Sequence, residues 1–196
     1  MTRPFILASA SPARRRLLEA AGIHPEVVVS GVDESQVAGS DPNELAAALA
    51  ELKATAVAPQ TPSNAFVMGC DSVLHFDGEI LGKPDGPEEA VSRWKRMRGE
   101  VGVLYTGHCL IDRTADRTIV QTAATTVHFA EVSDAEIAAY VETGEPLHVA
   151  GSFTLDGYGS AFIKKIEGDP GTVIGLSMPL LREMLGEVET NITTLW

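Results

Sequence analysis

Short apolar runs and longer amphipathic segments alternate along the chain, and the apolar runs predict β-strands. FILAS, EVVVSG and AFVMGC have the apolar character of buried strands. A hairpin is expected where Asp77 and Gly78 separate two short apolar runs, because this dipeptide favours a tight turn. The expected strands are 5–9, 26–31, 65–70, the hairpin 74–81, 102–112, 118–130 and 161–166.

Capping residues predict where the helices begin. Ser11, Asp41 and Ser177 are each expected to cap a helix that has a proline among its first residues. Ser133 and Glu136 have the spacing of a capping box. The expected helices are 12–22, 43–58, 84–99, 134–144 and 177–186. Helices and strands interleave while several strands are sequence neighbours, which favours an α/β fold with a mixed sheet in one domain, 1–196.

The composition is that of a globular domain with a sizeable core. The chain has 196 residues, 44% apolar content and a mean hydropathy of +0.07. Its net charge of −12 disfavours binding to nucleic acid polymers and to anionic membrane surfaces. No apolar run has the length of a membrane span, and FILASA is too short for a signal-peptide core. Cys70 and Cys109 are too few for a disulfide framework, so buried, reduced thiols and a cytoplasmic location are expected.

Several common signatures are absent from the sequence. GEILGKP lacks the spacing of a P-loop, GYGSAF lacks the third glycine of a dinucleotide fingerprint, and GLSMP lacks the second glycine of a nucleophile elbow. The five histidines, at 24, 75, 108, 128 and 148, have no metal-binding spacing and are expected to be structural or exposed.

Three arginines follow the Ser11 cap in SASPARRR, where the helix end already carries a partial positive charge. Each cation there is disfavoured by about 0.3–1 kcal/mol, and a solvated helix face is the simplest interpretation of such a run. A bound polyphosphate would reverse this penalty, because it would meet backbone N–H groups and guanidinium groups together. Arg14 and Arg15 have the best positions for such contacts, whereas Arg16 is expected to face solvent.

Acidic residues are expected at the carboxyl ends of two strands, where α/β sheets bind ligands. Asp71 follows the run that ends at Cys70, and Asp33 and Glu34 follow the strand 26–31. Converging carboxylates would hold a hard divalent cation such as Mg²⁺, although Asp71 in isolation is also suited to capping a turn.

Two lysines complete the candidate set. Lys53 stands in an otherwise apolar helical stretch, where the alternative is a side chain that reaches out to water. Lys83 lies between Gly82 and Pro84, so its backbone is restricted while its ammonium group can reach a ligand. Cationic side chains and a metal around one carboxylate are typical of chemistry at a phosphoryl centre.

Seven blocks occur in a fixed order from Leu7 to about Leu181: LASASPARRRLL, GVDES, LAELKA, GCDSVL, ILGKP, YVETGEP and AGSFTLDGYGSAFIKKIEG. In this order they resemble the Maf family of nucleoside triphosphate pyrophosphatases. The resemblance implies an inosine-triphosphatase-like (Maf-like) fold, an elongated two-lobed α/β molecule with a central cleft. It also implies hydrolysis of a nucleoside triphosphate to the monophosphate and pyrophosphate, with Mg²⁺ or Mn²⁺ as cofactor.

Carried over by position, the resemblance assigns the general base to Asp71, and the metal site to Glu34 together with Asp71. The family's phosphate-binding residues fall on Ser9, Ser11 and Arg14, and its two lysines fall on Lys53 and Lys83. The resemblance further implies that water attacks the α-phosphorus.

Three positions that the family links with nucleobase preference depart from its patterns. Arg often follows the Ser-Pro where this chain has Ala13, Thr often follows the base where it has Ser72, and Asp156 replaces a Gln. Asp156 would repel a phosphate but could accept a hydrogen bond from a base N–H. These residues fit neither the dTTP/UTP pattern nor the 7-methyl-GTP pattern, so the preferred nucleobase stays open.

Two other functions stay open at this point. A nucleotidyltransferase would use similar chemistry but pass the nucleotidyl group to an acceptor other than water. A nucleotide-binding regulator, for instance of cell division, would bind a nucleotide without significant turnover. For a hydrolase, removal of non-standard nucleotides is the expected role, and the resemblance and exposed strands favour a homodimer.

Overall fold

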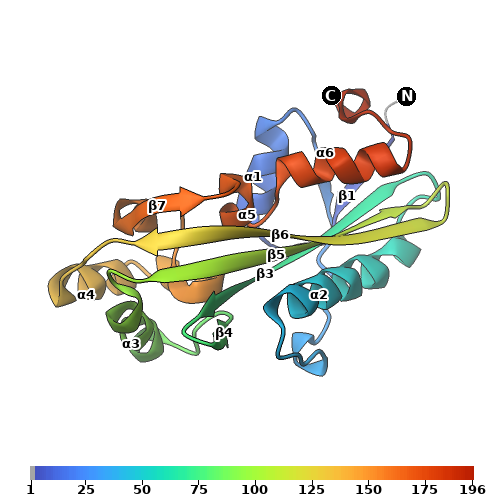
Figure 1. Ribbon diagram of the computed structural model, residues 1–196. Coiled ribbons are helices and arrows are strands. Elements are labelled where there is room, and N and C mark those ends of the chain that lie inside the picture. Colours follow the sequence, from blue (N-terminus) through green and yellow to red (C-terminus); the bar gives the residue numbers. More distant parts are fainter. Residues whose placement is uncertain (1–2) are drawn as a thin grey trace. The chain divides into compact units, whose positions relative to one another are not determined.

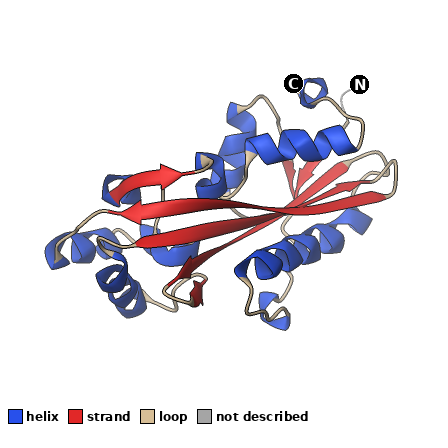
Figure 2. Cartoon of the chain, in the orientation of Figure 1, coloured by secondary structure: helices blue, strands red, loops and turns tan. Residues whose placement is uncertain are grey.

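The computed structural model describes residues 3–196, whose strands form a mixed sheet (Figures 1 and 2). The strands are β1 (Phe5–Leu7), β2 (Glu26–Val27), β3 (Phe66–Phe76), β4 (Glu79–Leu81), β5 (Val101–Asp112), β6 (Arg117–Phe129) and β7 (Ile163–Glu167). Their order is β2-β1-β3-β5-β6-β7, and β4 pairs with β3. β1 is parallel to β2 and β3, whereas β4 and β7 are antiparallel to their partners β3 and β6. The expected mixed α/β class is confirmed.

Four of the expected helices begin where their capping residues predict, whereas the helix expected from Pro84 begins at Pro87, after Gly86 at its N-cap position, and α5 was not predicted. The helices are α1 (Pro12–Ala20), α2 (Pro42–Val57), α3 (Pro87–Met97), α4 (Asp134–Glu142), α5 (Pro170–Ile174) and α6 (Met178–Glu187). Ser11, Asp41 and Ser177 each accept a backbone N–H at the start of their helix, and Ser133 forms the capping box with Glu136. Among the described residues, no helix is long and apolar enough to cross a membrane.

Tertiary contacts divide the chain into two compact units. The first unit comprises the chain up to Asp71 with Thr106–Ala123 and Gly175–Trp196, and the second comprises Ser72–Tyr105 and Ala124–Ile174. Because β3, β5 and β6 each contribute residues to both units, three continuous strands connect the two.

The sheet of the first unit is covered on both faces (Figure 1). One face packs against α1 and α6 through a cluster that includes Leu18, Leu181 and Met184. The opposite face packs against α2 through a cluster that includes Ala50 and Ala54. Cys70 and Cys109 belong to different clusters, and both are buried free thiols, as expected.

Helix α2 lies directly on this sheet because two glycines leave room for its backbone. A Cβ atom on Gly69 would lie 2.3 Å from the carbonyl oxygen of Ala50, and one on Gly107 would lie 2.0 Å from that of Ala46. Only glycine therefore fits at these points of β3 and β5. The close approach fixes the position of Lys53, which stands on the same helix.

The second unit has an aromatic core beneath α3 and α4. Trp94 makes edge-to-face contacts with Phe129, Tyr140 and Phe162 at centroid distances of 5.7, 5.6 and 5.8 Å. Such pairs favour one arrangement of the rings as well as burying apolar area. The predicted hairpin joins β3 to β4, with Asp77 and Gly78 both at positive φ as a tight hairpin turn requires.

Four of the predicted strands have wrong boundaries. The strand expected to end at Cys70 continues to Phe76, so Asp71 lies in the middle of β3 and not at its carboxyl end. The strand continues because Val73, Leu74 and Phe76 supply buried apolar side chains beyond the carboxylate. The strands expected at 5–9 and 26–31 shorten to β1 and β2. β2 is short because it forms the sheet edge, where Val27 and Val29 stay exposed. The strand expected at 161–166 starts two residues later, since 158–162 forms a 3₁₀ turn.

Candidate functional site

The start of α1 holds Arg14 in a buried position. Ser11 caps the helix by accepting the backbone N–H of Arg14 at 3.4 Å. The hydroxyl of Ser9 accepts Nη1 of Arg14 at 3.0 Å and the N–H of Ser11 at 3.2 Å. The Nε of Arg14 donates to the carbonyl oxygen of Gly175 at 2.7 Å. Arg14 is thus folded back over the cap with only 9% of its surface exposed. The structure brings together three of the predicted phosphate-binding residues.

The neighbouring arginines lie elsewhere on the helix. Arg15 is exposed, and its Nε pairs with Glu19 Oε1 at 2.7 Å, one turn further along. Arg16 is also exposed, as expected. Arg15 was expected beside Arg14 at the anion site, whereas the structure pairs it with Glu19 on the exposed surface.

A second cluster forms around the ammonium group of Lys53. Lys53 on α2 and Asp71 on β3 are each 8% exposed and form an ion pair. The same ammonium lies 2.8 Å from Oε1 of Glu34, whose side chain is about half exposed. Lys53 therefore does not reach out to water but joins two carboxylates.

Glu34 is held in place by a short turn. It begins the 3₁₀ turn Glu34–Gln36, which Asp33 caps by accepting the N–H and hydroxyl of Ser35 at 3.0 and 2.6 Å. The hydroxyl of Ser35 lowers the pKa of Asp33 below its ordinary value. Of the two acids expected after the second strand, Glu34 thus pairs with Lys53, while Asp33 orders the turn.

Both clusters act on the same buried thiol, that of Cys70. Burial raises the pKa of this thiol to about 12; Arg14 and Lys53 act to lower it, and Asp71 acts to raise it. Charges influence a group in this way only over short distances in a protein. Arg14, Lys53 and Asp71 therefore lie within electrostatic range of Cys70 in the first unit, and the protonated thiol itself is chemically inert.

The remaining predicted site residues are less buried. Ala13 is half-buried on α1, and Ser72 directly follows Asp71 in β3. Lys83 and Asp156 are exposed side chains of the second unit. Their exposure contrasts with the burial of Lys53 and Asp71.

The backbone next to Lys83 is held by the buried side chain of Arg93. Arg93 of α3 is 8% exposed and donates to the carbonyl oxygens of Gly82 and Lys83 at 2.6 and 3.5 Å. The carbonyl of Gly82 also accepts the N–H of Gly151 at 3.1 Å. The backbone that carries Lys83 is therefore fixed although its ammonium group is exposed.

Glu145 has a similar role beside Asp156, and sequence reasoning missed it. Its carboxylate accepts the N–H groups of Tyr158 and Gly159 at 3.0 and 2.9 Å and the hydroxyl of Tyr140 at 3.0 Å, together with the hydroxyl of Thr154. The one sequence signal for Glu145 is its place directly after Gly144, at the start of a turn. Its hydrogen-bond partners lie 5 to 14 residues away along the chain, and no local pattern predicts them.

The two carboxylates around Lys53 have the donor chemistry of a hard divalent cation site. Glu34 and Asp71 already share one cation, the Lys53 ammonium group. Mg²⁺ prefers oxygen ligands and is commonly held by one or two carboxylates together with water and substrate phosphates. Within residues 3–196, no three His, Cys, Asp or Glu residues are grouped to hold a metal by themselves. The two carboxylates therefore fit a divalent ion whose other ligands would be water and the phosphates of a substrate.

Comparison with known proteins supports the resemblance seen in the sequence. Residues 4–188 match the family described as Maf-like protein. The chain belongs to the Maf-like family. Two curated relatives are named nucleoside triphosphate pyrophosphatase: that of Salinispora tropica is 60% identical over 98% of this chain and 87% of its own length. That of Trichormus variabilis is 57% identical over 100% of this chain and 98% of its own length. A crystal structure of the nucleoside-triphosphatase, or dITP/XTP pyrophosphatase, of Mycobacterium abscessus aligns over 95% of this chain and 94% of its own, at 13% identity and a TM-score of 0.42.

Proposed function

We propose that this Maf-like protein hydrolyses a nucleoside triphosphate to the monophosphate and pyrophosphate. The observations that carry the proposal are the buried ion pair of Lys53 with Asp71, which Glu34 joins, and the buried Arg14 at the start of α1. The name shared by its relatives at 53–60% identity supports the same reaction.

The triphosphate is proposed to bind at the start of α1. Arg14 supplies a buried guanidinium group there, Ser9 and Ser11 supply hydroxyls, and the helix end favours negative charge. A buried guanidinium pairs with phosphate more strongly than an exposed one, since water screens it less. Arg15 is assigned no contact in this proposal, because it pairs with Glu19 on the exposed side of the helix.

Asp71 is proposed as the general base. It takes a proton from a water molecule as the water oxygen bonds to the α-phosphorus, and the bond from that phosphorus to the bridging oxygen of the pyrophosphate breaks. The pair of electrons from the broken bond leaves with the pyrophosphate. Lys53 holds the Asp71 carboxylate in place, because the two groups form a buried ion pair between α2 and β3.

Cations are proposed to stabilise the charge that develops on the departing pyrophosphate. Arg14 and Lys53 supply positive charge from the first unit. Lys83 is proposed as a further cation because it matches a lysine of the family motif. Glu34 and Asp71 would hold Mg²⁺ or Mn²⁺, which when bound would act as a Lewis acid toward the phosphate oxygens.

The choice of nucleobase is proposed to depend on Ala13, Ser72 and Asp156. A carboxylate at 156 accepts hydrogen bonds but cannot donate them, so it favours a base that presents an N–H group. A role in removing non-standard nucleotides, a cytoplasmic location and a homodimer stay predictions from the sequence.

A panel of standard and modified triphosphates tests the proposal. With Mg²⁺ or Mn²⁺ present, the expected products are one monophosphate and one pyrophosphate for each triphosphate consumed. Pyrophosphate that appears only when an acceptor is added would indicate a nucleotidyltransferase instead. Tight nucleotide binding without any product would indicate a regulator and would refute the proposed hydrolysis.

A further inference from the structure

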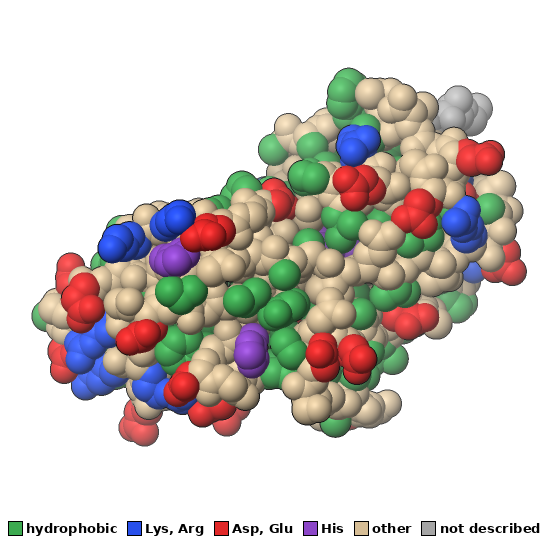
Figure 3. Space-filling view, in the orientation of Figure 1, with side chains coloured by type: hydrophobic (Ala, Val, Ile, Leu, Met, Phe, Trp, Pro, Cys, Tyr) green, Lys and Arg blue, Asp and Glu red, His purple; other side chains and the backbone are tan. Residues whose placement is uncertain are grey.

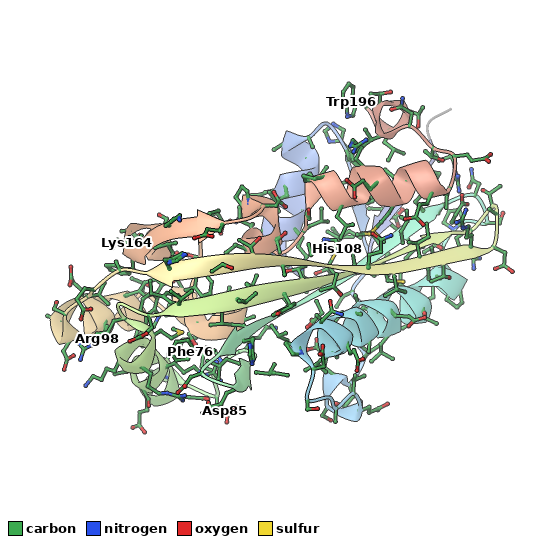
Figure 4. All side chains as sticks on the ribbon, viewed as in Figure 1. Phe76, Asp85, Arg98, His108, Lys164 and Trp196 are labelled. Atoms are coloured by element: carbon green, nitrogen blue, oxygen red, sulfur yellow. The ribbon has the colours of Figure 1, made fainter. Side chains whose placement is uncertain are left out.

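His108 is a fully buried histidine of β5 that lies on the side of the sheet covered by α6 (Figure 4). Its Nε2 lies 2.8 Å from the backbone N–H of Ser177, which is a donor. Nε2 must therefore be the unprotonated acceptor, and the ring hydrogen lies on Nδ1, which donates to the carbonyl oxygen of Thr106 at 2.9 Å. The two contacts define one neutral tautomer of His108.

Ser177 ends a three-residue segment that begins at Gly175. Its hydroxyl caps α6 by accepting the N–H of Leu180 at 3.3 Å, so both its backbone and its side chain are engaged. Leu176, in the middle, is fully buried in the core of the first unit. The segment is thus fixed at Ser177 and Leu176 before the chain reaches Gly175.

Gly175 forms the surface on which Arg14 rests. Its φ of +123° is a conformation that other residues rarely adopt. A Cβ atom there would lie 3.0 Å from Nε and 3.4 Å from Cγ of Arg14. The carbonyl oxygen of the same residue accepts that Nε at 2.7 Å. A shift of this segment would therefore move the guanidinium group away from Ser9.

We propose that His108 is the positioning residue that holds Arg14 in its phosphate-binding orientation, acting through the 175–177 segment. The inference rests on the proposed function only in taking phosphate as the ligand of Arg14. A buried backbone N–H without an acceptor is strongly unfavourable, so an apolar residue at 108 would force the segment to move. A side-chain oxygen that reached Ser177 would hold it.

Four variants separate this role from a general structural one. His108→Leu removes the acceptor, and His108→Gln offers an amide oxygen in place of Nε2. Gly175→Ala perturbs the 175–177 segment at the end that contacts Arg14. It replaces His108→Leu as the test variant if His108→Leu fails to fold. Cys109→Ala is the matched control, because it truncates the next buried side chain of β5, which packs on the opposite face of the sheet.

The first measurement is hydrogen exchange of the Arg14 Nε–H, followed by ¹⁵N NMR and assigned by its loss in Arg14→Ala. The wild-type proton should exchange slowly because it donates to Gly175. His108→Leu and Gly175→Ala should speed its exchange several-fold, whereas His108→Gln and Cys109→Ala should leave it slow. Unchanged exchange in His108→Leu and Gly175→Ala would overturn the inference.

The second measurement is the affinity for inorganic tripolyphosphate in a double-mutant cycle. His108→Leu should raise Kd about tenfold in the wild-type background, the scale of a misplaced binding group, and should have no further effect in an Arg14→Ala background. An equal effect in both backgrounds would show that His108 acts independently of Arg14. Neither measurement requires hydrolysis, so a protein that binds tripolyphosphate but cleaves no triphosphate would refute the proposed function alone.

Discussion

The two units use buried charge in different ways. In the first unit, the buried Arg14, Lys53 and Asp71 are candidate site residues, whereas the buried Asp112 pairs with Arg3 and accepts the N–H of Thr114. In the second unit, the buried Arg93 and the partly buried Glu145 bind backbone groups, while the candidates Lys83 and Asp156 are exposed.

This difference has a physical consequence for catalysis. Reacting groups must be held to within a fraction of an ångström, which buried ion pairs on helices and strands achieve. Exposed side chains at loops are accessible to ligands of different shapes. The proposed function therefore assigns the chemical step to the first unit and variable substrate contacts to residues of the second.

The surface adds little to this contrast. On the face shown in Figure 3, acidic and basic side chains are interspersed over both ends of the view. Exposed pairs such as Arg96 with Glu79 contribute at most about 1 kcal/mol each. Such exposed pairs on this face therefore add little to stability.

The largest expected effect is on turnover, in Asp71→Asn. Removal of the base should reduce kcat on the order of 10² to 10⁴-fold, while the fold and the nucleotide affinity are retained because asparagine can still accept from Lys53. Steady-state kinetics with a direct binding measurement would check both. Unchanged kcat would reject Asp71 as the base and would remove the distinction between the units.

The next effect is on stability, in Lys53→Met compared with Lys83→Met. Lys53→Met leaves the buried Asp71 carboxylate without its ammonium partner, and unfolding should become easier by about 3 kcal/mol. Lys83→Met removes an exposed charge and should change stability by less than about 0.5 kcal/mol. Urea unfolding of both variants measures the difference, and equal losses would contradict the proposed contrast between buried and exposed lysines.

The smallest effect concerns Glu145→Gln and its dependence on pH. Burial acts to raise the pKa of Glu145, but hydrogen bonds from the Thr154 hydroxyl and from the N–H groups of Gly159 and Tyr158 outweigh it, so the pKa is lowered overall. The carboxylate therefore stabilises the fold above its unfolded pKa of about 4.3, and this contribution is lost as the pH falls through the lower folded value.

At pH 7, Glu145→Gln should be less stable than the wild type by about 1 kcal/mol, because one hydrogen-bonded acceptor position becomes a donor. The gap should close as the pH falls below about 4. Thermal unfolding of the wild type and the variant between about pH 3 and pH 7 measures this difference in stability, because the range spans the ordinary pKa of a glutamate. A gap that persists undiminished at the lowest pH would show that the lost stability does not come from the ionised carboxylate.

Local features of the molecule were predictable from the sequence, because a cap or turn depends on a few adjacent residues. Ser11, Asp41, Ser133 and Ser177 cap helices as predicted, and Asp77-Gly78 forms the predicted hairpin. The motif resemblance identified the family that residues 4–188 match.

Long-range features were not predictable in this way. Asp71 was expected at a strand end, yet β3 continues past it. Buried apolar residues follow Asp71 in the strand, and the ion pair with Lys53 on α2 stabilises its buried carboxylate. The choice between Arg14 and Arg15 depends on Gly175, which lies 161 residues from Arg14. His108 and its partner Ser177 are 69 residues apart, so the histidine had no local signal of its role.

The most direct test of the central claim is hydrolysis in water labelled with ¹⁸O. If the water activated by Asp71 attacks the α-phosphorus, mass spectrometry should find the label in the nucleoside monophosphate and none in the pyrophosphate. Asp71→Asn should slow the appearance of both products to the same extent. Label in pyrophosphate, or products consisting of the diphosphate and orthophosphate, would contradict the account.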